Sequence, residues 1–215
     1  MKLAINILIA FLFLGTAYGQ EDAKAKKILD DLSSKTKAYK SMAVTFSIVI
    51  TNAEDGSKIT QKGKAYLKGD KYKIELEEQD IYCDGETVTT HLKLDKECYT
   101  SDVDEAEEDG SVTPSNMLTI WEEGYKYEYK RETTFKDIPV HQIHLYPKDP
   151  KDSKFHTIIL KIDKAKNELL SVYIKGKDGN NMRYILKNLE ENVEIPESKF
   201  VFDRSKHPEV ECYEE

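Results

Sequence analysis

Apolar and polar residues alternate along most of this chain, and a period of two is typical of β-strands. The clearest stretch is 42–51, where Val44, Phe46, Ile48 and Ile50 alternate with threonines, a serine and a valine. The pattern recurs at hairpin spacing, with turn residues such as Asp-Gly between segments, and predicts one antiparallel meander of about ten or eleven strands. The expected strands are 42–51, 63–67, 72–76, 81–83, 88–92, 98–101, 125–133, 140–146, 156–162, 169–174 and 182–189, with a final segment at 198–202.

A helical segment precedes the strands, at residues 22–40. Ile28, Leu29 and Leu32 lie on one stripe there, while lysines and aspartates fill the other faces. This spacing of three to four residues predicts an amphipathic helix with one apolar face.

A second break in the alternation lies in the middle of the chain, after an acidic run at 102–110. Thr113 suits a helix N-cap, Pro114 suits the first helical position, and Gly124 suits the position past the end. The apolar stripe of this short helix consists of Met117, Leu118, Ile120 and Trp121. A short helix inside a sheet either plugs an ordinary core or covers an opening, and the sequence leaves both interpretations open.

Together these elements predict a mainly β protein with a few helices, of the α+β class. A large sheet with one apolar face and no second sheet needs a cover, and two short helices shield it only in part. The result would be an apolar cavity beneath a lid, which would suit lipid chains. The cavity candidates are Val44, Phe46, Ile48, Ile50, Leu67, Tyr72, Ile74 and Leu76, and the lid candidates are Ile28, Leu29, Leu32, Met117, Leu118, Ile120 and Trp121.

The N-terminus has the pattern of a secretory signal peptide. Lys2 precedes an apolar run at 3–14, and the small residues Ala17 and Gly19 follow it. We therefore expect export, cleavage after Gly19, and a single domain over residues 20–215. The apolar run is too short for a comfortable membrane span, which disfavours an uncleaved anchor.

Charge and motifs narrow the possible functions. The formal net charge of −8 makes nucleic acid a poor partner. His141 and His144 are three apart on an expected strand, so they point to opposite faces and do not converge on a metal. The acidic run 102–109 lacks the ligand spacing of a calcium loop. With no nucleophile motif and no phosphate-binding glycine loop, we expect no enzyme, no metal and no cofactor.

The chain has three cysteines, Cys83, Cys98 and Cys212. An exported protein can form a disulfide, but an odd count leaves at least one thiol unpaired in a monomer. The sequence favours neither a single bridge nor three buried thiols, and it does not choose a pair.

Several short motifs follow one another in a familiar order over nearly the whole chain after residue 19. They are KSMAVTF at 40–46, GKAYL at 63–67, DKYKIE at 70–75, CDGETV at 83–88, PSNML at 114–118 and FVFD at 200–203. Together with the signal pattern and the mid-chain helix, these motifs resemble the periplasmic outer-membrane lipoprotein carrier family, LolA.

The resemblance implies an open antiparallel half-barrel whose concave apolar face is lidded by helices. It implies a periplasmic, monomeric carrier that takes acylated lipoproteins or lipids from an inner-membrane lipoprotein-releasing transporter and delivers them to an outer-membrane receptor. Relatives with this fold act instead as lipid-binding sensors or regulatory modules, which is the alternative function. Which lipoproteins or lipids would be carried does not follow from the sequence.

One position departs from the family pattern. Well-studied members have an arginine followed by proline after the strand that matches 63–67, and that arginine helps to hold the lid closed. Here Lys68 is followed by Gly69 and Asp70. Lys68 is therefore the candidate latch, although its ammonium group lacks the planar fork of a guanidinium.

Overall fold

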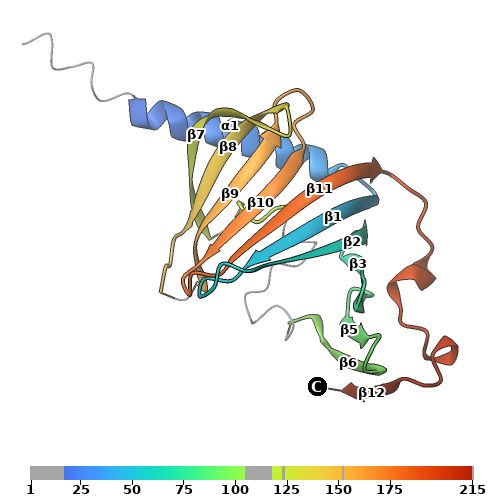
Figure 1. Ribbon diagram of the computed structural model, residues 1–215. Coiled ribbons are helices and arrows are strands. Elements are labelled where there is room, and N and C mark those ends of the chain that lie inside the picture. The colour runs from blue at the N-terminus through green and yellow to red at the C-terminus, as the bar shows by residue number, and fades with distance from the viewer. Residues whose placement is uncertain (1–16, 105–117, 123, 152, 215) are drawn as a thin grey trace, which may run out of the picture.

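The computed structural model describes residues 17–104, 118–122, 124–151 and 153–214. Its main element is one 12-stranded sheet that curls into an open half-barrel (Figure 1). The strand order is β12-β6-β5-β4-β3-β2-β1-β11-β10-β9-β8-β7. The strands are β1 (Met42–Thr51), β2 (Lys58–Lys68), β3 (Lys71–Leu76), β4 (Gln79–Cys83), β5 (Thr87–Leu92), β6 (Glu97–Asp102), β7 (Tyr125–Phe135), β8 (Ile138–Pro147), β9 (Phe155–Asp163), β10 (Leu169–Gly176), β11 (Asn181–Glu191) and β12 (Glu211–Glu214).

The chain enters the sheet at its centre rather than at an edge. From β1 it runs outward through consecutive hairpins to β6, and it resumes at the opposite edge with β7. The hairpins β7 to β11 then lead back until β11 pairs antiparallel with β1. The antiparallel meander predicted from the alternation is therefore confirmed, and it is folded back on its own first strand.

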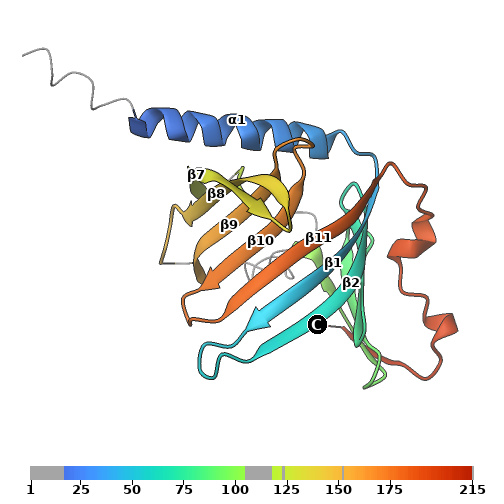
Figure 2. The same cartoon turned by 45° about the horizontal axis from the view of Figure 1, so that its top comes forward.

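The helix α1 (Ala17–Lys37) lies along the half of the sheet formed by β7 to β10 (Figure 2). Its buried residues Ala25, Leu29 and Leu32 belong to one core cluster with Ile143 and Leu160 of the sheet. The predicted amphipathic helix is confirmed, with its end at Lys37 rather than at residue 40. Residues 1–16 of the predicted signal peptide lie outside the described residues.

The second predicted helix is wrong in its described part. Residues 118–121 form turns, and the Glu122 amide donates to the Thr119 carbonyl oxygen over 2.9 Å. On a helix, Leu118 and Trp121 would share one face. In the turn Leu118 packs against two core clusters, the one under α1 and the one on β1 to β5, whereas Trp121 is buried in the cluster under α1. Thr113, Pro114 and Met117 lie outside the described residues.

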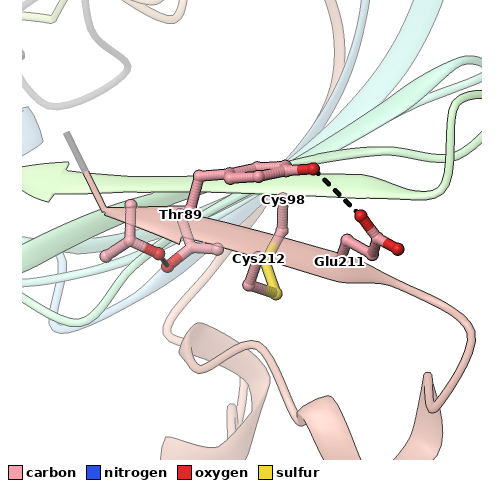
Figure 3. The surroundings of a disulfide bond; sticks show 6 residues. Thr89, Cys98, Glu211 and Cys212 are labelled. Atoms are coloured by element: carbon pink, nitrogen blue, oxygen red, sulfur yellow. Dashed lines mark hydrogen bonds between the residues drawn. A yellow bond between two sulfur atoms is a disulfide. The ribbon is translucent and has the colours of Figure 1, made fainter.

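The C-terminal arm, residues 192–210, crosses the convex side of β3 to β5, and it contains no strand. The predicted strand at 198–202 is wrong, because Glu197–Phe200 forms a 3₁₀ helix after Pro196 and buries Phe200. The arm ends in β12, which pairs parallel with β6. A disulfide between Cys98 and Cys212 joins these two strands (Figure 3). Cys83 is a buried free thiol.

Candidate apolar binding groove

An apolar groove lies on the concave face, over the half of the sheet that α1 does not cover. Its volume is about 260 Å³, and most of its lining is aliphatic or aromatic. It is lined by Met42, Val44, Phe46, Ile48, Gln61, Ala65, Leu67, Ile74, Leu76, Gln79, Ile81, Leu118, Tyr184, Leu186 and Leu189. The lining comes from β1 to β4, from β11 and from the turn at 118, so the groove spans the line where the two ends of the meander meet.

Small residues on β2 create the depth of the groove. Gly63 pairs with Phe46 across the strands, and Ala65 pairs with Val44. A Cβ atom added at Gly63 would lie 2.6 Å from Cζ of Phe46 and 2.7 Å from the carbonyl oxygen of Glu75. Because such distances are shorter than van der Waals contact, only glycine allows the Phe46 ring to lie across β2.

A second pocket, the hairpin-end pocket, continues the groove toward the β1–β2 and β10–β11 turns. Its volume is about 410 Å³. It is lined by the apolar residues Ile50, Ile59, Phe155, Ile174 and Met182 and by the polar residues Asn52, Ser57, Lys154, Asp178 and Asn180, with Gly176.

The two pockets lie end to end on the same face. Ile48 lines the groove and Ile50 lines the hairpin-end pocket, and residues two apart on a strand share a face. The same step of two residues separates Tyr184 from Met182 on β11. From Val44 to Ile50 the path is roughly 20 Å long at about 3.3 Å per residue. Ile59, which is 61% exposed, lies at the open end of this path, in the hairpin-end pocket.

Polar contacts fasten the turn at 118–122 to α1 beside the groove. The Trp121 Nε1–H group donates to Ser33 Oγ over 2.8 Å in a buried site. Lys37 Nζ lies 2.7 Å from Glu122 Oε2, and its hydrogen bond lowers the pKa of that carboxyl group. The helix and the turn therefore form one unit at the rim of the groove.

The structure brings most of the cavity candidates together. Val44, Phe46, Ile48, Leu67, Ile74 and Leu76 line the groove. Ile50 lines the hairpin-end pocket, and Tyr72 packs in the core cluster beneath the groove without lining it. That these residues bind lipid stays a prediction.

The lid candidates divide into two groups. Leu118 lines the groove. Leu118 also packs against the core cluster over β7 to β10. That cluster holds Ile28, Leu29, Leu32, Ile120 and Trp121, which do not line the groove, and Met117 lies outside the described residues.

Within the described residues, the hydrogen bonds and the ion pair of Lys68 go to the C-terminal arm and not to α1 or the turn at 118–122, and its role as a latch stays a prediction. Its Nζ atom lies 2.5 Å from Glu197 Oε1 and donates to the Ile195 carbonyl oxygen over 3.3 Å. The ammonium groups of Lys68 and Lys71 lower the pKa of Glu197 to about 2. Lys68 binds the C-terminal arm because this arm passes the end of β2 and places the Ile195 carbonyl oxygen and the Glu197 carboxylate beside the Lys68 ammonium group.

The sequence interpretation missed the β11 side of the groove, which consists of Tyr184, Leu186 and Leu189. Their alternation was visible, but their pairing with β1 was not, because it joins segments far apart in the chain. Among the described residues no group of histidine, cysteine and carboxylate side chains is arranged to hold a metal ion. No helix within the described ranges is long and apolar enough to cross a bilayer.

The fold and the groove define a class of protein, the open β half-barrels with an apolar concave face. The family profile described as outer membrane lipoprotein carrier protein LolA matches residues 37–203. The chain therefore belongs to the LolA family.

Individual relatives are distant. An uncharacterized protein of Methanocaldococcus jannaschii is 24% identical over 200 residues, which cover 91% of this chain and 57% of that protein. The chain thus spans a little over half of that relative's length. A solved structure of an uncharacterized conserved protein from Thermus thermophilus matches with a TM-score of 0.59 at 10% identity, covering 89% of this chain and 99% of that chain. A DUF1329 family protein from Desulfovibrio piger matches with a TM-score of 0.50 at 12% identity, covering 87% and 99%.

Proposed function

We propose that this protein is a non-enzymatic carrier that shields the acyl chains of lipoproteins or lipids in the apolar groove. The observation that carries the proposal is the groove and the hairpin-end pocket, which together form an apolar path along β1. Each methylene group left in water costs about 0.8 kcal/mol, so a long acyl chain does not cross an aqueous space without a cover.

The ends of the path suggest how the chain would lie. At one end Met42 and Leu67 are buried, each residue being 6% exposed. At the other end Ile59 and Met182 are exposed beside polar rim residues. We propose that the hydrocarbon enters from the hairpin end and leaves its polar head group at that rim.

The family points to the place of action. We propose that residues 1–19 direct export, that the protein works in the periplasm, and that it passes cargo from an inner-membrane transporter to an outer-membrane receptor. Cleavage after Gly19 would remove the first residues of α1 and leave the stripe with Ala25, Leu29 and Leu32 intact.

Binding can be tested directly. Native mass spectrometry of protein purified from its source should show co-purified lipid or lipopeptide, and delipidated protein should take up a fluorescent fatty-acid probe. The variant Ala65→Phe fills the groove and should lower the affinity for the probe by about tenfold or more. The matched control is Ala165→Phe, which places the same side chain in an exposed turn. Absence of lipid, together with no uptake of the probe by the wild-type protein, would refute the carrier function.

A further inference from the structure

A second kind of pocket lies on the convex face, opposite α1. This basic pocket has a volume of about 220 Å³. It is lined by Phe135, Gln142, Ile159, Lys161, Ser171, Tyr173, Lys175 and Arg183. Leu160 and Val172 point to the concave core, so their chain neighbours Lys161 and Ser171 point to the other side of the sheet. The basic pocket is therefore separated from α1 and from the apolar path by the sheet itself.

The charge of the basic pocket is uncompensated. Three of its lining residues are cations, Lys161, Lys175 and Arg183, and none of its described lining residues is a carboxylate. Within the described part of the chain, no salt bridge involves any of these three side chains. This is unusual in a protein with 40 acidic and 32 basic residues, in which many other lysines pair with a carboxylate.

Aromatic rings hold two of the cations in place. Lys161 Nζ lies 4.7 Å from the centroid of the Phe135 ring, and Arg183 Cζ lies 4.4 Å from the centroid of the Tyr173 ring. Such cation–π contacts orient the charged groups before a ligand arrives. Ser171, only 2% exposed, adds a hydroxyl group to the lining.

The pKa of Lys161 also indicates an excess of positive charge in the basic pocket. Burial lowers the pKa of its ammonium group, and the neighbouring Arg183 and Arg131 lower it further. Positive charges held close together repel each other, and a bound anion would remove that repulsion.

We propose that the basic pocket binds a phosphate group, carried either by a small soluble molecule or by a lipid head group. A phosphate ester carries up to two negative charges and three acceptor oxygens, which suit two ammonium groups and one guanidinium better than a single carboxylate does. The pocket volume accommodates a phosphate with a small organic substituent. The basic pocket shares no lining residue with the groove, so phosphate binding can be tested independently of the carrier function.

The first experiment measures binding of inorganic phosphate and glycerol phosphate by titration calorimetry and by amide chemical shifts. We expect shifts centred on β9 to β11 and an affinity that falls as salt concentration rises. Lys161→Met should weaken binding by about tenfold, since it removes one charge-assisted hydrogen bond. The matched control is Lys62→Met, an exposed lysine of β2 outside the pocket, which should bind as the wild-type protein does.

The second experiment separates the two sources of phosphate. If a lipid head group is the ligand, vesicles containing phosphatidic acid should sediment the wild-type protein but not the folded Lys161→Met variant, and pure phosphatidylcholine vesicles should sediment neither. If a soluble molecule is the ligand, glycerol phosphate should bind and neither vesicle should. The proposal is overturned if phosphate binds in neither form, or if Lys161→Met and Lys62→Met behave alike.

Discussion

At the scale of single residues, Trp121 is the only tryptophan in the chain and joins two separate segments. Its indole N–H group donates to Ser33 Oγ of α1 in a buried site. The sequence placed Trp121 on a lid stripe but gave no sign of this partner, because Ser33 lies 88 residues earlier.

Ser33→Ala should leave the Trp121 N–H group buried without an acceptor. The free energy of unfolding should fall by about 1–3 kcal/mol, the cost of an unsatisfied buried donor. Urea unfolding followed by tryptophan emission measures this change. Ser34→Ala is the matched control, since its hydroxyl donates to the backbone carbonyl oxygen of Asp30 at an exposed site. Its loss should lower the free energy of unfolding by less than about 0.5 kcal/mol. Equal losses in the two variants would contradict the assigned role of the Trp121–Ser33 bond.

His91 makes stability depend on pH. Its side chain is buried among Phe202 and His207 of the C-terminal arm, and its Nδ1 atom has no hydrogen-bond partner among the described residues. Burial lowers the pKa of His91, and His207 and Lys93 lower it further against the opposite effect of Asp80. The folded protein therefore binds a proton at His91 more weakly than the unfolded chain, in which the pKa is near 6.5.

The free energy of unfolding should therefore fall as the pH drops from about 7 to about 5. His91→Phe keeps an aromatic ring against Phe202 and should make this fall smaller. Part of the fall should remain, because burial also lowers the pKa of His141 and His144. Urea unfolding at several pH values measures the slope in the wild type and in the variant. A slope that is the same in His91→Phe and the wild type would rule out His91 as a contributor.

At the scale of elements, the disulfide holds the C-terminal arm against the edge of the sheet. Cys98 and Cys212 are 114 residues apart, and β12 has only four residues. A cross-link over so long a loop mainly restricts the unfolded chain. Reduction should therefore lower the free energy of unfolding by about 2–4 kcal/mol.

Urea unfolding with and without a reducing agent tests this prediction. Cys212→Ser should show the loss already, and added reductant should then change nothing further, because Cys83 is a free thiol in the native protein. If reductant destabilises Cys212→Ser as much as the wild type, the Cys98–Cys212 disulfide is not the source of the loss in free energy of unfolding.

The elements also show what the sequence could predict. Strands β1 to β11 were expected because each carries its own alternation of apolar and polar residues. The segment at 198–202 was misread, since Pro196 and the burial of Phe200 favour a 3₁₀ helix there. The strand β12 was missed, because it depends on β6 for pairing and on Cys98 for its cross-link. The candidate groove was half predicted: the β1 to β3 side followed from local patterns, and the β11 side required a pairing across the chain.

At the scale of the whole molecule, the two faces of the sheet are chemically distinct. The concave face offers an apolar path, and the convex face offers the basic pocket. A variant in one should leave the other intact, since sites without shared partners behave additively. Ala65→Phe should accordingly bind phosphate like the wild type, and Lys161→Met should take up the fatty-acid probe like the wild type.

The pairing of β1 with β11 has a consequence for the order of events during synthesis. Ser47 faces Ile185 across the strands, so one edge of β1 stays bare until β11, which ends at Glu191 of the 215 residues, has been made. At roughly 5–20 residues per second, that wait is on the order of ten seconds. Throughout it, Val44, Phe46 and Ile48 form an exposed apolar edge strand, which is a hazard for aggregation. We therefore expect this edge of β1 to remain prone to aggregation until β11 has been made and pairs with it.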